Sequence, residues 1–231
     1  MLIAGVDEAG RGCVIGPMAI AGVLVDEGGL EKLLRLGVRD SKTLSPARRK
    51  ELAILIEREA LALRVVLVQP REIDEAVLRK GLNKLEARVM ASIIDELGPD
   101  VVYVDSSDVV EGRFASTIRS YLRSGGRVKV IAEHGADAKY PVVAAASIIA
   151  KVRRDEALEA IKRRLGLDLG SGYPSDPRTL AFLRSWYARH KSYPDFVRKT
   201  WRTAREIAAE EGAAKLDSWC RKKDGAFTRG A

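Results

Sequence analysis

Two adjacent carboxylates, Asp7 and Glu8, stand at the end of a short apolar run near the start of this 231-residue chain. The run covers residues 2–6, and a Gly-Arg-Gly turn follows at 10–12. Apolar runs bounded by turn residues are typical of buried strands. Ionised carboxylates are rare on buried elements unless a cation pairs with them. The tip of this strand therefore predicts a cationic partner.

The rest of the chain alternates between strand and helix patterns. Strands are predicted at 2–8, 18–25, 63–68, 101–104 and 128–132. Helices are predicted at about 30–36, 46–60, 70–78, 83–97, 111–124, 141–164, 177–190 and 194–211, with a turn at 26–29. This order predicts an α/β layer fold with a mixed five-stranded sheet flanked by helices. We expect the first strand pair to be antiparallel and the later strands to be parallel.

The charge balance is compatible with two kinds of protein surface. Lys and Arg number 40 against 32 Asp and Glu, which gives a formal net charge of +8. Such a surplus favours polyanionic partners, but mixed Arg and Glu are equally typical of the ion-pair networks of heat-tolerant proteins. Composition alone favours neither interpretation.

Cysteine and histidine are too sparse and too widely spaced for a disulfide framework or a zinc site. Cys13 and Cys220 lie far apart, as do His134 and His190. The sequence has no N-terminal signal pattern and no apolar stretch of bilayer length. We therefore expect a cytoplasmic protein that does not contact a membrane.

Acidic residues follow three of the predicted strands. Asp7 and Glu8 end the first, Asp105 ends the fourth, and Asp137 comes shortly after the fifth. In open α/β sheets the carboxyl ends of the strands line the ligand crevice, so these side chains are expected to converge. Repulsion between them would be relieved by Mg²⁺ or Mn²⁺, which prefer oxygen ligands. Two such ions about 4 Å apart serve phosphoryl transfer, so the pattern predicts metal-dependent nuclease chemistry.

Each of these residues also has an ordinary structural interpretation. Asp7 and Glu8 could pair with Arg11 in the turn, and Asp105 could cap the helix that follows it. Asp137 could be a common loop acid. Taken singly, Lys42 and Lys139 could be surface lysines, and the ring of Tyr173 could simply pack within its glycine-rich loop.

Five sequence blocks together resemble the ribonuclease HII family, a type 2 ribonuclease H. They are Asp7-Glu8-Ala9-Gly10-Arg11-Gly12, Asp40-Ser41-Lys42, Val104-Asp105, the segment from His134 to Lys151, and Gly170-Ser171-Gly172-Tyr173-Pro174-Ser175-Asp176-Pro177. The blocks span residues 2 to about 205 in order, and residues 197–201 are similar to the archaeal form.

The resemblance implies a ribonuclease H-like fold with a helical C-terminal segment. We expect a catalytic domain over 1–165, a loop and helices over 166–221 that cover the substrate side, and a flexible tail over 222–231. A monomer is expected.

The resemblance also implies cleavage of the RNA strand of RNA–DNA hybrids and of single ribonucleotides embedded in duplex DNA. The products would carry a 3′-hydroxyl and a 5′-phosphate, and the roles would be ribonucleotide excision repair and RNA primer removal. Mg²⁺ or Mn²⁺, two ions per site with substrate bound, is the expected cofactor. A replication clamp is a further candidate partner.

Residue roles transfer by position from the family motifs. The catalytic and metal-binding residues would be Asp7, Glu8, Asp105 and Asp137. The substrate-binding residues would be Gly10, Arg11, Gly12, Lys42, Lys139 and Tyr173. The glycines let the backbone approach a sugar, and Tyr173 offers a ring and a hydroxyl.

Two other functions are compatible with the same residues. Another nuclease of this fold, such as a junction resolvase, also places carboxylates on strand ends but does not need a 2′-hydroxyl. A basic hybrid-binding protein would use the acids only structurally and would show no cleavage.

Overall fold

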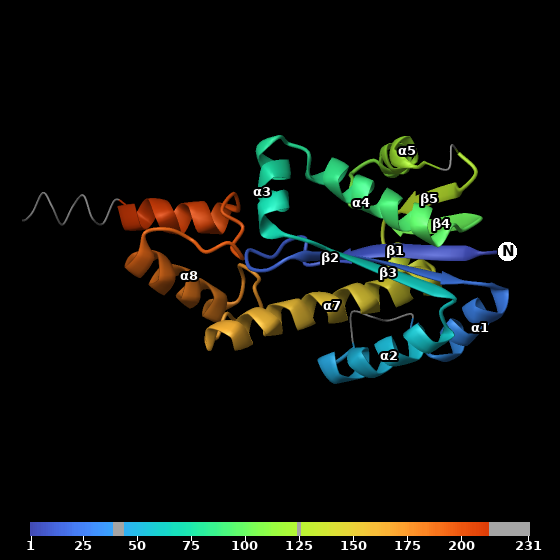
Figure 1. The fold of residues 1–231 in the computed structure, drawn as a ribbon, viewed down its shortest axis with the longest axis horizontal. Coiled ribbons are helices and arrows are strands. Elements are labelled where there is room, and N and C mark those ends of the chain that lie inside the picture. Colours follow the sequence, from blue (N-terminus) through green and yellow to red (C-terminus); the bar gives the residue numbers. More distant parts are fainter. Residues whose placement is uncertain (39–43, 124–125, 213–231) are drawn as a thin grey trace, which may run out of the picture.

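A single mixed sheet organises the chain (Figure 1). The computed structural model describes residues 1–38, 44–123 and 126–212. The strands are β1 (Ile3–Ala9), β2 (Met18–Val25), β3 (Ala62–Val68), β4 (Val101–Asp105) and β5 (Lys129–Glu133), in the order β3-β2-β1-β4-β5. β2 is antiparallel to β1 and β3, whereas β4 is parallel to β1 and to β5. The predicted mixed five-stranded sheet with an antiparallel first pair is confirmed.

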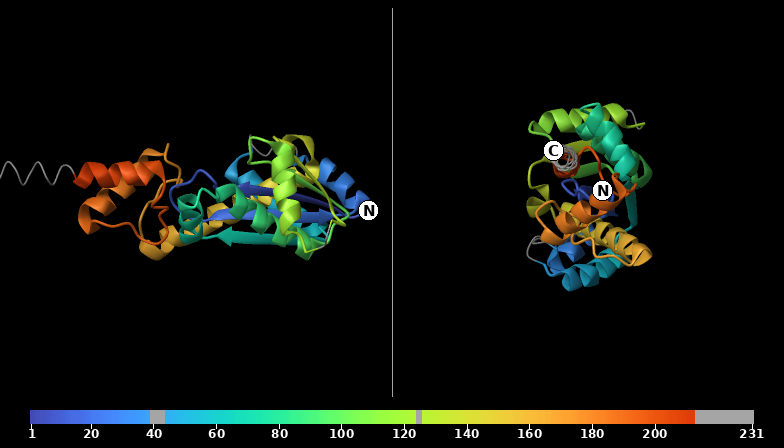
Figure 2. Two further views of the ribbon diagram at one scale, coloured as in Figure 1. Left: turned by 90° about the horizontal axis from the view of Figure 1, so that it is seen from above. Right: turned by 90° about the vertical axis from the view of Figure 1, so that its left-hand side faces the viewer.

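Helices cover both faces of the sheet (Figures 1 and 2). One face carries α3 (Pro70–Leu78), α4 (Leu82–Leu97) and α5 (Glu111–Tyr121). The other carries α1 (Glu27–Arg35), α2 (Pro46–Glu59) and α7 (Pro141–Leu165). A short helix, α6 (Ala136–Lys139), joins β5 to α7 and was not predicted. Within the described residues, no helix has both the length and the apolarity needed to cross a bilayer.

Small residues bring α7 unusually close to β1. A Cβ atom on Gly5 would lie 2.3 Å from the carbonyl carbon of Val142, a distance that real side chains do not adopt. The following residues 143–150 of α7 are all buried. The helix therefore lies directly against the strand that carries the acidic pair.

A third apolar cluster lies beyond the sheet and joins the C-terminal segment to the rest of the chain. It combines Val14 and Ile15 with Leu158 of α7 and with residues between 169 and 207. α8 (Pro177–His190) and a helix over 202–212 form this end of the molecule, opposite the N-terminus (Figure 1). The predicted division at residue 165 stays a prediction, and the predicted tail at 222–231 lies outside the described residues.

Two local predictions are wrong. Residues 26–29 are not a turn, because the Asp26 side chain accepts a hydrogen bond from the Gly29 N–H at 2.7 Å and starts α1 at Glu27. Residues 194–201 are not helical, because this stretch lies alongside Val14 and Ile15 and its backbone bonds to theirs instead. Val197 forms a bridge with Ile15, and the Arg198 N–H donates to the Val14 carbonyl at 2.9 Å.

Candidate active site

Asp7 and Glu8 lie on opposite faces of the sheet although they are adjacent in β1. Side chains alternate along a strand, so neighbouring residues point in opposite directions. Asp7 faces α7, where Ser147 and Lys151 act on its charge. Glu8 faces α4, where it lies near Glu86. The end of β1 therefore presents a carboxylate to each layer of helices.

Burial dominates the electrostatics of both groups. Asp7 is 5% exposed, and burial raises its pKa to about 7, with Asp105 raising it further and Ser147 opposing the shift. Burial also raises the pKa of Glu8 well above its ordinary value, and repulsion from Asp7, Glu86 and Asp105 adds to the effect. Ionising both groups near neutral pH is therefore costly unless a cation neutralises them.

A hydrogen bond joins Asp105 to Ala136, the residue before Asp137. Asp105 ends β4, the parallel neighbour of β1, and its Oδ1 accepts the N–H of Ala136 at 2.8 Å. Asp137 is the next residue and is buried. Asp105 does not cap the helix that follows it, because α5 begins only at Glu111. It instead holds the start of α6 and with it the position of Asp137.

The chemistry of these residues fits a hard divalent cation. All four are carboxylates, and the buried Oε2 of Glu8 has no hydrogen-bond donor among the described residues. Across 1–38, 44–123 and 126–212, no three acidic, cysteine or histidine side chains already surround one point as ligands do. Asp7, Glu8 and Asp105 nevertheless lie close enough to repel one another, which a bound cation would relieve.

Arg11 pairs with a buried glutamate of α4, and its charge also acts to lower the pKa of Glu8. Its Nε lies 2.7 Å from Oε1 of Glu86, and its Nη2 donates to Oδ1 of Asn83 at 2.8 Å. Glu86 also accepts from the Ser107 hydroxyl at 2.7 Å. The guanidinium is thus fixed on α4 rather than on Asp7 or Glu8, and its side chain remains 39% exposed.

A buried arginine of the C-terminal segment donates hydrogen bonds to the backbone of the turn at 10–12. Arg198 has no exposed surface. Its Nη2 donates to the Gly10 carbonyl at 2.8 Å, its Nη1 to the Arg11 carbonyl at 2.7 Å, and its Nε to the Gly16 carbonyl at 3.1 Å. Gly10 has a φ of +81°, a left-handed conformation that glycine adopts readily. The shape of the turn is therefore set by glycine and by this guanidinium.

Tyr173 lies beside that turn. The preceding Gly172 carbonyl accepts N–H groups of Val14 at 2.8 Å and Ile15 at 3.2 Å. The guanidinium carbon of Arg154 lies 4.9 Å from the Tyr173 ring centroid. Tyr173 remains 39% exposed, so part of its ring can meet a ligand.

Of the two lysines predicted to contact substrate, Lys139 lies within the described residues and pairs with an acid. Lys139 donates to Oε2 of Glu133 at 2.7 Å, and the same carboxyl group accepts the Tyr140 hydroxyl at 2.9 Å. Lys139 therefore already has an acidic partner at the end of β5. Lys42, with Asp40 and Ser41, lies outside the described residues.

A profile of the Ribonuclease HII family matches residues 4–204. The chain belongs to the ribonuclease HII family. Ribonuclease HII of Pyrococcus furiosus is 47% identical over 229 residues, which cover 96% of this chain and 100% of that protein.

Two solved structures agree with this assignment. Ribonuclease H2 from Pyrococcus horikoshii OT3 is 46% identical, with a TM-score of 0.84 over 91% of this chain and 99% of that one. Ribonuclease HII from Archaeoglobus fulgidus, solved in a complex with PCNA, is 44% identical, with a TM-score of 0.80 over 87% of this chain and 96% of that one.

Membership settles the broad class of function. Ribonuclease HII proteins are hydrolytic endonucleases with ribonuclease H activity on RNA–DNA hybrids. The ribonuclease H-like fold expected from the resemblance is confirmed. A junction resolvase and a non-catalytic hybrid-binding protein are therefore excluded as descriptions of this chain.

Three residues that shape this ribonuclease HII site were not predicted: Glu86, Arg154 and Arg198. The sequence did contain a signal for the first two, because each lies at helical spacing from apolar residues that are buried. A charged side chain on a buried helix face requires a partner. Glu86 lies four residues before Met90, and Arg154 lies four before Leu158. Arg198 lies within residues 197–201, which were identified as similar to the archaeal form, but nothing in that segment indicated that its side chain would bind the turn at 10–12.

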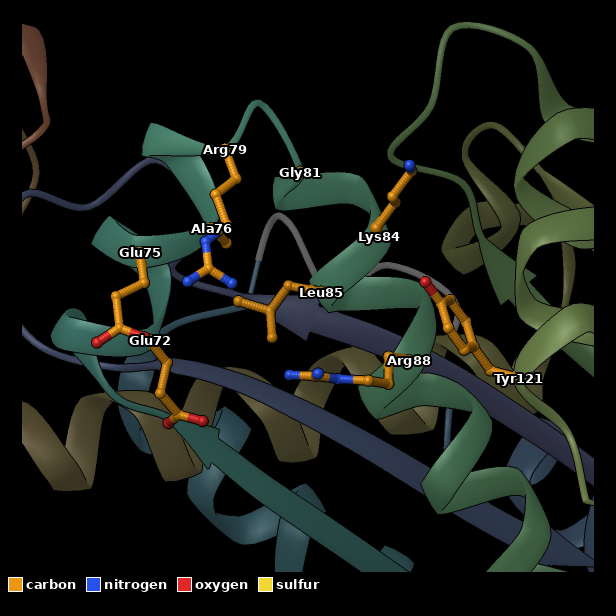
Figure 3. Close-up of a pocket in the computed structure, with 9 residues that line it drawn as sticks. All are labelled: Glu72, Glu75, Ala76, Arg79, Gly81, Lys84, Leu85, Arg88 and Tyr121. Atoms are coloured by element: carbon orange, nitrogen blue, oxygen red, sulfur yellow. The ribbon is translucent and has the colours of Figure 1, made fainter.

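A surface cavity of about 420 Å³ lies between α3, α4 and the end of α5, apart from the carboxylates (Figure 3). Its charged lining is mixed, with Arg79, Lys84 and Arg88 set against Glu72 and Glu75. None of the predicted site residues lines it. The four predicted site acids, Asp7, Glu8, Asp105 and Asp137, therefore lie outside this cavity.

Proposed function

We propose that this chain cleaves the RNA strand of RNA–DNA hybrids, and also cleaves at single ribonucleotides within duplex DNA, with the help of Mg²⁺ or Mn²⁺. The products would carry a 3′-hydroxyl and a 5′-phosphate. The observation that carries the proposal is that the two acids of β1, the buried Asp7 and the half-buried Glu8, are followed within a few residues by the turn at 10–12, whose carbonyl groups Arg198 holds.

The acids supply the metal-binding half of the site. We infer that Asp7 and Asp105, on adjacent parallel strands, anchor the ions, and that Glu8 and Asp137 complete the ligand sets. Two divalent cations bound there would stabilise the attacking and leaving oxygens of phosphodiester hydrolysis. The unpartnered Oε2 of Glu8 supports this assignment.

The turn and the tyrosine supply the recognition half. Because Arg198 holds the Gly10 and Arg11 carbonyls inward, the turn keeps one backbone shape before substrate arrives. The 2′-hydroxyl distinguishes RNA from DNA and both donates and accepts hydrogen bonds. We infer that Gly10, Arg11 and Gly12 read this group and that Tyr173 stacks on the deoxyribose side of the junction. Lys42 and Lys139 are proposed phosphate contacts, the second after release from Glu133.

The cellular setting is proposed from the same substrates. Removal of embedded ribonucleotides and of RNA primers would serve DNA repair and replication in the cytoplasm. The Archaeoglobus fulgidus relative was solved with PCNA, which supports a replication clamp as a partner of this chain.

A cleavage assay on three matched duplexes tests the proposal. One is an RNA–DNA hybrid, one a DNA duplex with a single ribonucleotide, and one all DNA, each assayed with Mg²⁺, Mn²⁺ or EDTA. We expect cutting of the first two with either ion, no cutting in EDTA, and an intact all-DNA duplex. Asp7→Asn should bind hybrid but not cut it. Normal cutting by that variant, or cutting of all-DNA duplex, would contradict the scheme.

A further inference from the structure

Arg154 of α7 lies buried between the turn and the tyrosine loop. It is 5% exposed, and its Nη2 donates both to the Ser171 carbonyl at 2.5 Å and to Sγ of Cys13 at 2.7 Å. Its Nη1 donates to Oδ1 of Asp155 at 2.9 Å. One guanidinium thus contacts both Cys13, which follows the turn at 10–12, and Ser171, which lies two residues before Tyr173.

The same guanidinium lies over the ring of Tyr173. Its carbon is 4.9 Å from the ring centroid, within the range of a cation–π contact. Arginine is suited to this double task because its planar fork donates along its edge while its face stacks on an aromatic ring. Lysine would keep the charge but lose the fork and the stacked face.

The surrounding backbone leaves Arg154 little freedom. A Cβ atom on Gly10 would lie 3.0 Å from its Cγ, and a Cβ atom on Gly172 would lie 3.0 Å from its Nη2. Both glycines have positive φ angles, +81° and +80°. The side chain therefore fills the space that these two glycines leave open.

We propose that Arg154 is a positioning residue that fixes the Tyr173 ring relative to the turn at 10–12, so that preference for a ribonucleotide within DNA depends on Arg154 through Tyr173. The inference rests on the proposed function, in which Tyr173 reads the junction. Arg154 itself touches neither substrate nor cation in this scheme.

A double-mutant cycle on Arg154 and Tyr173 provides the test. Arg154→Met keeps a long apolar stem and removes the fork, Arg154→Lys keeps the charge, and Tyr173→Ala removes the ring. Values of kcat and KM are measured with Mg²⁺ on the single-ribonucleotide duplex and on the RNA–DNA hybrid. Arg153→Met is the matched control, because Arg153 pairs with Glu57 and Glu156 on a partly exposed surface.

We expect Tyr173→Ala to lower kcat on the single-ribonucleotide duplex about 100-fold and Arg154→Met to lower it at least about 10-fold, since small misplacements cost this much. The double variant should lose no more than Tyr173→Ala alone, because the two residues act as one unit. Arg154→Lys should resemble Arg154→Met, and Arg153→Met should match the wild type. Hybrid cleavage should fall less than single-ribonucleotide cleavage in both Arg154 variants.

Thermal unfolding is measured for every variant, and rates are compared well below the lowest midpoint. If Arg154→Met does not fold, the Arg154→Lys cycle is used in its place. Losses that multiply in the double variant, or wild-type rates in the Arg154 variants, would overturn the inference alone. A wild-type chain that leaves the single-ribonucleotide duplex intact would instead overturn that part of the proposed function, and this inference with it.

Discussion

Arg11 and Glu86 form an ion pair in which one partner is open to solvent and the other is not. The Nε–Oε1 distance is 2.7 Å, the Arg11 side chain is 39% exposed, and the Glu86 side chain is fully buried. Burial raises the pKa of Glu86, and the charge of Arg11 opposes that rise. Arg11 therefore has a structural task that is separable from any contact with substrate.

Removing Arg11 should destabilise the fold through Glu86. We expect Arg11→Ala to lower the free energy of unfolding by about 2 kcal/mol or more, because a buried carboxylate loses its partner. Adding Glu86→Gln should restore most of that loss. Urea unfolding at neutral pH measures both effects. As a control, Arg71→Ala breaks an exposed pair with Glu75 and should change stability by less than about 1 kcal/mol. Equal stabilities of the single and double variants would argue against this account.

Asp7 should make the ion-free protein less stable as pH rises. Its folded pKa of about 7 lies above the value near 3.8 expected of an unfolded aspartate, so the folded state holds more protons between these values. Stability is therefore lost through that window, by at most about 1.4 kcal/mol per pH unit for one group. In EDTA, Asp7→Asn should be more stable than the wild type at pH 8 and similar to it at pH 4. Urea unfolding at both pH values checks this, and a less stable variant at pH 8 would refute it.

Divalent cations should restore the stability that the ion-free protein loses when Asp7 ionises. Adding Mg²⁺ at pH 8 is expected to raise the unfolding midpoint of the wild type, because a ligand that binds only the folded state stabilises it. The shift should be smaller at pH 5, where Asp7 is largely protonated, and smaller in Asp7→Asn at either pH. Calorimetry with Mg²⁺ or EDTA measures the difference, with Na⁺ at matched ionic strength as the control. Equal shifts in the two proteins would remove Asp7 from the cation site.

Gly5 should tolerate no side chain. Its Cβ would lie 2.3 Å from backbone atoms of Val142, which cannot move without shifting α7. We expect Gly5→Ala to cost about 3 kcal/mol. Gly112→Ala is the matched control, because Gly112 lies in α5 and no other part of the chain that the structure describes comes within 4 Å of the position that its methyl group would take. That change should instead add up to about 1 kcal/mol. Similar unfolding curves for the two variants would contradict the close packing of α7.

Asp176 should stabilise the tyrosine loop only when ionised. Its oxygens accept the Ser171 N–H at 2.7 Å and the Arg178 N–H at 2.9 Å, and these bonds lower its pKa. A depressed folded pKa means that the stabilisation is present above the unfolded pKa, near 4, and is lost as pH falls through the folded value. Asp176→Ala should therefore be less stable than the wild type at pH 7, with the gap closing in strong acid. Exposed Asp195→Ala is the control and should show no such gap.

The strand acids could be predicted because two simple rules act at the same place. Side chains alternate along a strand, and the carboxyl ends of parallel strands meet at one edge, so Asp7 and Asp105 were predictable neighbours. The alternation also places Asp7 and Glu8 on opposite faces, but which layer of helices each one meets is known only from the structure. Their shared cation remains a prediction from chemistry.

The recognition half was predictable only in part. The Gly-Arg-Gly turn and Tyr173 were identified from motifs, but the contacts that join them come from residues far along the chain. Arg198 reaches the Gly10 carbonyl across a separation of 188 residues, within a stretch predicted to be helical. No local pattern encodes such a contact, because its energy depends on where the whole C-terminal segment packs.

The alternation of β1 also has a consequence for chains that fold incorrectly. β1 pairs with β2 in one register, from Ile3 opposite Val25 to Ala9 opposite Ala19. A slip of one residue would exchange Asp7 and Glu8 between α7 and α4 and would also move the turn away from Arg198. Under the proposed function, cleavage and recognition of the ribose would be lost together, so a misaligned chain would be inactive rather than a nuclease without discrimination.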